Sequence, residues 1–189
     1  TLLAQYPDLA WPQWDKVWRI ILMTYITMML ITDRQRLHWL VVVIALSLGF
    51  YGFKGGVFIL TGGSGNNVMG PQGSFIADRN SVGLALIMTV PLLWYVRLHA
   101  ENSWARLALL GGGALTLIAI VGTNSRGALV GLAAMGLFFL MKARNRLGVI
   151  LALIPVVLVV LYVMPPEWFE RMHTIQTYED DASAMGRFY

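Results

Sequence analysis

Long apolar segments separated by short polar connections run through most of the sequence. A helix needs about 20 residues to cross about 30 Å of hydrocarbon. The pattern therefore predicts an all-α integral membrane protein, a polytopic helix bundle with about six transmembrane helices. The first and fifth segments are short, which is typical of a tilted or partly inserted helix. The predicted segments cover residues 17–32, 37–53, 80–97, 105–123, 127–141 and 147–164.

The same pattern divides the chain into two regions. Residues 1–164 form the predicted transmembrane core, which a glycine-rich loop at residues 54–79 interrupts. Residues 165–189 are expected to begin a larger loop outside the membrane, so we expect the sequence to be a fragment of a longer protein.

Composition supports a membrane protein and narrows the possible ligands. Hydrophobic residues make up 57% and charged residues 13% of the chain, whereas soluble domains carry about 25% charged residues. The net charge of +4 would favour nucleic acid in a soluble protein, but here the basic residues collect in short connections, so we expect no nucleic-acid partner. The chain has no cysteine and three scattered histidines, so we predict no metal centre.

Basic residues predict how the segments are oriented. The connections after the first, third and fifth segments should be cytoplasmic, because short cytoplasmic loops are rich in Lys and Arg. Residues 54–79, the break at residues 124–127 and residues 165–189 then share the opposite side, which we take as the periplasmic side of a bacterial inner membrane. The basic residues of the three connections are Arg34, Arg36, Arg97, Arg106, Lys142, Arg144 and Arg146.

One arginine stands alone inside the apolar region. Arg126 is the only charged residue between Arg106 and Lys142. A charge at membrane depth costs several kcal/mol unless it is paired, hydrated or used, so Arg126 is a candidate site residue. The alternative is that its side chain extends to the interface from the end of a helix.

The glycine-rich connection is the second candidate region. Glycines let the backbone bring N–H groups close to an anion. The stretch is not a Walker loop, because no Gly-Lys-Ser/Thr follows it, and a flexible external turn is the alternative. Lys54 begins the connection and Arg79 with Asn80 ends it, on the predicted side of Arg126.

Five short motifs resemble the O-antigen ligase and polymerase superfamily, most closely the O-glycosylation ligases associated with exosortase systems. Taken alone, Ser-Arg-Gly is a weak motif, but in this order, between apolar segments and with the upstream glycine turn, it is more specific. The motifs are Phe53-Lys54-Gly55-Gly56, Gly70-Pro71-x-Gly73-Ser74, Asp78-Arg79-Asn80, Asn124-Ser125-Arg126-Gly127-Ala128 and Ser183-Ala184-x-Gly186-Arg187.

The resemblance implies a membrane glycosyltransferase with the C-type (GT-C) helical fold. Such an enzyme would move a glycan from polyprenyl diphosphate, for example undecaprenyl diphosphate, to a hydroxyl of a lipid or protein acceptor. It would use no cofactor, metal or ATP. Arg126 and Arg79 would be catalytic, and Lys54, Asn80 and Arg187 would help to bind the diphosphate or glycan. The general base is expected to be a histidine beyond residue 189.

Each site residue also has a plainer interpretation. Arg79 could pair with Asp78, and Lys54 could simply end a membrane segment. We prefer a helix-capping role for Asn80 and Ser81, and a helix-start role for Ser125. The alternative functions are polymerisation of O-antigen or exopolysaccharide, transport of a polysaccharide by a flippase, or a membrane scaffold without activity.

Overall fold

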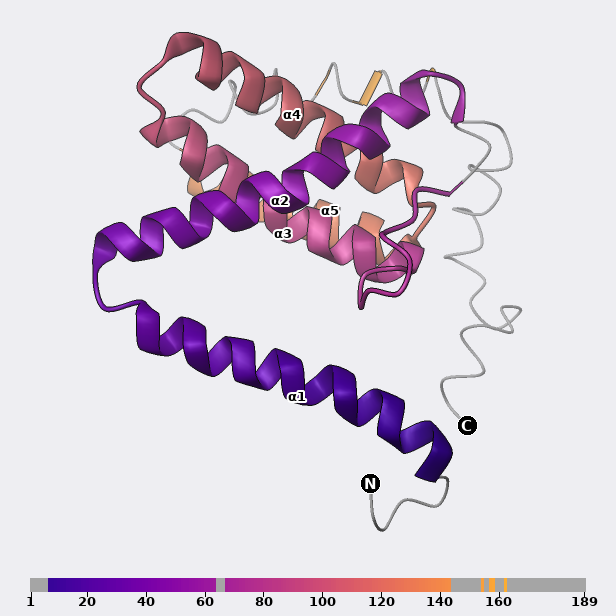
Figure 1. The fold of residues 1–189 in the computed structure, drawn as a ribbon. Helices are drawn as coiled ribbons and strands as arrows, with labels where there is room; N and C mark the ends of the chain where they lie inside the picture. Colours follow the sequence, from indigo (N-terminus) through magenta and orange to yellow (C-terminus); the bar gives the residue numbers. More distant parts are fainter. Residues whose placement is uncertain (1–6, 64–66, 144–153, 155–156, 159–161, 163–189) are drawn as a thin grey trace. The chain divides into compact units, whose positions relative to one another are not determined.

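A computed structural model describes residues 7–63, 67–143, 154, 157–158 and 162 of the chain. In this part of the chain the regular elements are helices, with no strand. Figure 1 shows the helices along the chain. Their bounds are α1 (Pro7–Leu30), α2 (Arg34–Leu60), α3 (Arg79–His99), α4 (Ser103–Gly122) and α5 (Arg126–Lys142).

The chain divides into two compact units, residues 1–41 and residues 42–189. The first unit contains α1 and the beginning of α2. Within it, Arg36 donates a hydrogen bond of 3.0 Å to the carbonyl oxygen of Leu30, which satisfies an acceptor at the end of α1. Helix α1 begins ten residues earlier than predicted, and it includes Asp15 and Arg19, which form an exposed ion pair of 2.7 Å.

In the second unit, a row of small residues brings α2 close to α4. A methyl group at Gly56 would collide with the backbone of Leu115, and one at Gly52 would collide with Thr116. Small residues at helix interfaces allow this close approach of two backbones in membrane proteins. The glycines therefore serve packing between helices here.

This packing corrects the predicted start of the glycine-rich loop. Residues 54–60 belong to α2, which continues to Leu60, and the connection to α3 covers residues 61–78. Glycine weakens an isolated helix by about 1 kcal/mol relative to alanine. Here Gly55 and Gly56 are buried, and contact with the neighbouring helix offsets that weakness.

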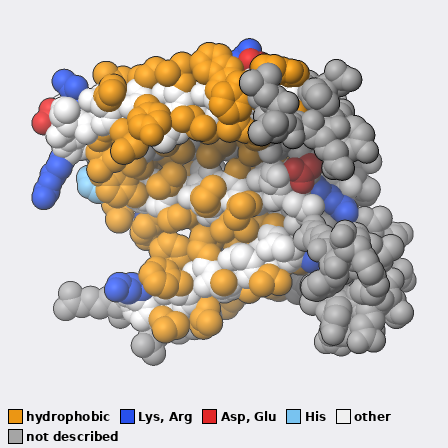
Figure 2. Space-filling view, turned by 90° about the horizontal axis from the view of Figure 1, so that it is seen from below, with side chains coloured by type: hydrophobic (Ala, Val, Ile, Leu, Met, Phe, Trp, Pro, Cys, Tyr) orange, Lys and Arg blue, Asp and Glu red, His pale blue; other side chains and the backbone are white. Residues whose placement is uncertain are grey.

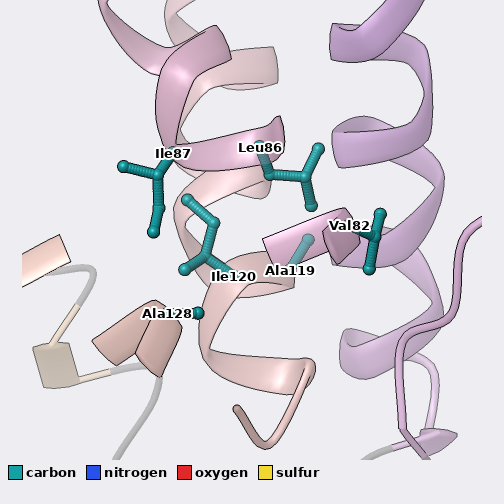
Figure 3. Close-up of a cluster of buried hydrophobic side chains, with 6 residues drawn as sticks. All are labelled: Val82, Leu86, Ile87, Ala119, Ile120 and Ala128. Atoms are coloured by element: carbon teal, nitrogen blue, oxygen red, sulfur yellow. The ribbon is translucent and has the colours of Figure 1, made fainter. Parts of the chain in front are cut away.

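The core of the second unit lies between α3, α4 and α5. Figure 3 shows side chains from all three helices converging on one apolar cluster. Leu86 of α3 and Ile120 of α4 are almost fully buried there, and Ala128 of α5 completes the contact. The cluster fixes the beginning of α5 against α3 and α4. Its members are Val82, Leu86, Ile87, Ala119, Ile120 and Ala128.

Among the described residues, three helices are long and apolar enough to cross a membrane, namely α2, α3 and α4. Hydrophobic side chains cover much of the described surface in Figure 2. The predicted all-helical, polytopic membrane fold is thus confirmed. The sixth predicted segment, 147–164, lies almost entirely outside the described residues, and residues 165–189 lie wholly outside them.

Candidate functional site

The polar break between α4 and α5 is a tight, ordered turn. The hydroxyl of Thr123 is fully buried and donates to the carbonyl oxygen of Ile120 at 2.7 Å, which closes the end of α4. Asn124 follows with a φ of 52°, in the left-handed region that few residues other than glycine adopt. Ser125 then caps α5, and its Oγ accepts a hydrogen bond of 3.2 Å from the N–H of Ala128.

The connection between α2 and α3 runs past this turn. The backbone N–H of Val68 donates to the carbonyl oxygen of Gly122 at 3.0 Å, and the Val68 side chain is buried. Further along, the N–H of Gly70 donates to the carbonyl oxygen of Ala77 at 3.1 Å, which closes the rest of the connection into a compact loop. The end of α4 is therefore held on one side by residues 67–68.

Two asparagine side chains join the loop to the turn. Nδ2 of Asn124 donates a hydrogen bond of 2.7 Å to Oδ1 of Asn67, across 57 residues of sequence. Oδ1 of Asn124 is buried and has no hydrogen-bond partner among the described residues. The Asn124 amide thus makes its contact through its nitrogen, one residue before the cap of α5.

A second side-chain pair joins the turn to α3. Oγ of Ser125 donates a hydrogen bond of 2.7 Å to Oδ1 of Asn80. This contact corrects the preferred capping role of Asn80. Asp78 is the capping residue of α3, because its carboxylate accepts from the N–H groups of Asn80 and Ser81. The Asn80 side chain is consequently available for Ser125.

The structure brings the predicted site residues together only in part. Arg79 is the first residue of α3 and Arg126 the first residue of α5, and both are half-buried. Each arginine is the sequence neighbour of one member of the Ser125–Asn80 pair. Lys54 is exposed on α2, six residues before the end of that helix. Arg187 lies outside the described residues.

The capping residues of α3 and α5 differ in charge. Hydrogen bonds from the Ser81 hydroxyl, and then from the N–H groups of Ser81 and Asn80, hold the pKa of the exposed Asp78 carboxyl below its usual range. The N-terminus of α3 therefore already holds a carboxylate. Ser125, the cap of α5, is neutral, so the positive end of that helix dipole keeps its field.

Space is also left open at the beginning of α5. Gly127 is exposed, and among the described residues a Cβ atom placed on it would have only Ser125 Oγ near it, 3.9 Å away. A ligand can approach the backbone closely where no side chain covers it. Positive helix ends with uncovered backbone are common anion sites. The start of α5, with Arg126, is thus better suited to an anion than the start of α3.

Other chemistry at this turn is limited by the bonds already present. The Ser125 hydroxyl has one proton, which it donates to Asn80, so Ser125 serves as the helix-start residue and is not poised as a nucleophile. In the described ranges, no group of three or more His, Cys, Asp or Glu side chains is placed to hold a metal ion. The groups of this turn that can bind an anion are the Arg126 guanidinium and the backbone N–H groups at the start of α5.

Two family models match consecutive parts of the chain. The first is described as a family of unknown function, DUF5935, and it matches residues 1–101. The chain belongs to this family. The second is described as O-antigen ligase and matches residues 111–189, a range that contains the whole α4–α5 turn. Searches of curated proteins and of solved structures found no match.

The second match supports the predicted superfamily at a coarse level. It supports a membrane glycan-transfer enzyme of the O-antigen ligase family. Asn124, Ser125 and Arg126 lie inside the matched range, whereas Asn67, Arg79 and Asn80 lie in the range of the first match. The site is therefore assembled from both matched regions.

Sequence reasoning missed two residues of this arrangement. Asn67 lies in the glycine-rich stretch and was not singled out there. Asn124 was considered only as part of a motif and a polar break. Asparagine is among the few residues enriched in the left-handed region. An Asn between a finished helix and a Ser cap was the available signal for a turn at Asn124. No comparable local signal pointed to Asn67.

Proposed function

We propose that the chain is the membrane core of a glycosyltransferase that moves a glycan from a polyprenyl diphosphate carrier to an acceptor hydroxyl on the periplasmic face. The observation that carries the proposal is the Ser125–Asn80 hydrogen bond of 2.7 Å, which joins two helix N-termini that each begin with an arginine. The O-antigen ligase match over the α4–α5 turn supports the reaction class.

The reaction places its main electrostatic demand on the leaving group. The bond between the anomeric carbon and the diphosphate oxygen breaks, and a bond from the same carbon to the acceptor oxygen forms. The acceptor proton passes to a base, and polyprenyl diphosphate leaves with added negative charge. Fixed donors aimed at such developing charge are worth several kcal/mol in a site that excludes water.

Arg126 is the first candidate for this role. It lies at the neutral-capped, uncovered start of α5, where the helix dipole and the guanidinium act on an anion together. The arginine fork donates two hydrogen bonds to a phosphate and stays charged at any working pH. Arg79 is the second candidate, and Asn80 serves it indirectly by fixing α3 to the turn.

Lys54 and Arg187 remain candidates with weaker support. Lys54 is exposed on α2, next to Gly55, which faces Val68 and Ala119. A flexible lysine there would reach a glycan or carrier more easily than it would hold a fixed phosphate geometry. Arg187 is proposed from the family resemblance alone.

The test is reconstitution of the full-length protein with a polyprenyl diphosphate-linked glycan and an acceptor, in the presence of EDTA and without ATP. We expect glycosylated acceptor and free polyprenyl diphosphate, because the diphosphate linkage already carries the leaving group. Loss of transfer on chelation, restored by Mg²⁺ or Mn²⁺, would contradict the metal-free mechanism.

The same assay separates the alternative functions. A polymerase would lengthen the carrier-linked glycan without any added acceptor. A flippase would move the carrier-linked glycan across the membrane with its linkage intact, so free polyprenyl diphosphate would not appear. Both alternatives would overturn the proposed transfer to a separate acceptor, and a lipid or protein acceptor would be identified from the glycosylated product.

A further inference from the structure

Asn124 has two features that are explained together by one role. Its backbone lies in the left-handed region at φ 52°, where glycine would be the residue of least strain. Its side chain nevertheless makes a hydrogen bond of 2.7 Å to Asn67, 57 residues away. Glycine would form this turn with less strain but could not make the hydrogen bond to Asn67. The hydrogen bond is therefore what the Asn124 side chain contributes.

Two further hydrogen bonds between described residues lie close to that contact. The first is the bond of 3.0 Å from the Val68 N–H to the Gly122 carbonyl oxygen, which lies two residues before Asn124. The second is the bond of 2.7 Å from Ser125 to Asn80. The Asn124–Asn67 bond is the one that joins the loop to the turn itself, between the end of α4 and the cap of α5.

We propose that Asn124 is a positioning residue: its side-chain amide holds the loop at Asn67 against the α4–α5 turn and thereby fixes the direction in which α5 presents Arg126. Its effect on turnover rests on the proposed glycan transfer. The contact between Asn67 and Asn124 does not depend on that proposed function. The contact and its effect on turnover are therefore tested by separate measurements.

Geometry explains why a small shift of this turn matters. Arg126 is two residues beyond Asn124, and no further helical turn lies between them to absorb a change. Displacement of a catalytic donor by about 1 Å can cost roughly 100-fold in rate. The side chain of Asn124 would act through Arg126, without touching the substrate.

The first measurement tests the contact without any activity. Residues 1–189 contain no cysteine, so a cysteine pair introduced there is the only pair in this region. In the full-length protein in membranes, Asn67→Cys with Asn124→Cys should be joined by a short bifunctional thiol reagent. The control is Asn102→Cys with Asn124→Cys, which are separated by the 20 residues of α4 and should not be joined. Equal reaction of both pairs would overturn the proposal.

The second measurement uses transfer kinetics and thermal unfolding of single variants. Asn124→Gly keeps the left-handed turn without strain but removes the amide, so we expect an unchanged Tm and about a tenfold lower kcat. The KM for the acceptor should not change. Asn67→Ala should lower kcat by the same factor and, because it relieves no strain, should also lower the free energy of unfolding by about 1 kcal/mol. Asn67→Asp should keep the wild-type kcat because its oxygen still accepts from Asn124.

The double variant completes the test. Asn67→Ala combined with Asn124→Gly should be no slower than either single variant, because both remove one shared hydrogen bond. Wild-type kcat in Asn124→Gly would overturn the proposal and show that Asn124 serves the backbone only. If the Asn67 and Asn124 cysteines are joined but the wild-type protein transfers no glycan, the contact stands and the proposed function is wrong.

Discussion

Ser125 and Asn80 are joined by a hydrogen bond of 2.7 Å that links the beginnings of α5 and α3 across 45 residues of sequence. The same Ser125 hydroxyl accepts a hydrogen bond of 3.2 Å from the N–H of Ala128 and so caps α5. One buried hydroxyl therefore both starts a helix and fixes it to its neighbour. The contact thus joins the sequence neighbours of Arg126 and Arg79.

This double use predicts unequal effects of two alanine substitutions. Asn80→Ala removes one hydrogen bond and should lower the free energy of unfolding by about 1 kcal/mol. Ser125→Ala removes that bond and the helix cap, so we expect a loss of about 2 kcal/mol. Denaturant unfolding of the full-length protein in detergent measures both. A Ser125→Ala variant as stable as Asn80→Ala would show that the cap contributes nothing.

Asp78 predicts a pH dependence of stability. Its pKa is lowered in the folded protein, so the unfolded state binds a proton more readily and Asp78 stabilises the fold fully above the usual aspartate pKa. That contribution is lost as the pH falls through the lowered folded pKa. Asp78→Ala should therefore reduce Tm most at neutral pH, and the difference from wild type should shrink progressively in acid.

Asn102 is the matched control for that measurement. It caps α4 by accepting a hydrogen bond of 2.9 Å from the N–H of Trp104, and its amide does not titrate. Asn102→Ala should lower Tm by an amount that does not depend on pH. A parallel pH dependence in both variants would contradict the role of the Asp78 carboxylate.

Glycine packing between α2 and α4 predicts a third result. Gly56→Ala would place a methyl group against the Leu115 backbone, which cannot move as a flexible side chain can. We expect a loss of about 1–3 kcal/mol in unfolding free energy. Gly111→Ala on α4 is the control, because a Cβ atom there meets nothing within 4 Å and improves helix propensity. Its stability should be equal to or greater than that of the wild type.

Topology is the fourth prediction. The short connections rich in arginine should face the cytoplasm. A cysteine at Gln72 in the loop should react with an impermeant thiol reagent from the outside, whereas one at Glu101 between α3 and α4 should not. Gly63 is a poorer labelling site in the same loop, because it is buried against the ring of Phe58. Outside labelling of Glu101→Cys alone would reverse the orientation and move the site to the cytoplasmic face.

Much of the fold could be predicted from hydrophobic segments, because membrane helices leave a long, continuous signal. The predicted segments 80–97 and 105–123 agree closely with α3 and α4. Segment 37–53 ended too early, since the polar Lys54 and two glycines suggested a loop. The contact that keeps Gly55 and Gly56 helical comes from α4, more than 50 residues later, and no local pattern encodes it.

The candidate site was predictable only in its charged members. Arg79 and Arg126 were found because a charge near an apolar segment is unusual. The asparagine contacts were not found, because Asn67 and Asn80 are ordinary polar residues until folding brings them to the α4–α5 turn. Asn80 was predicted to cap α3, and that was wrong because the preceding Asp78 occupies the capping position.

The central claim, an anion site at Arg126, is tested most directly by glycan transfer in three variants of the full-length protein. Arg126→Lys keeps the charge but loses the bidentate fork, and Arg126→Ala loses both, so we expect at least about a 100-fold loss of kcat in each. The control, Arg19→Lys in the exposed pair with Asp15, should retain wild-type transfer. Wild-type transfer in both Arg126 variants would contradict the account and show that Arg126 only extends to the interface.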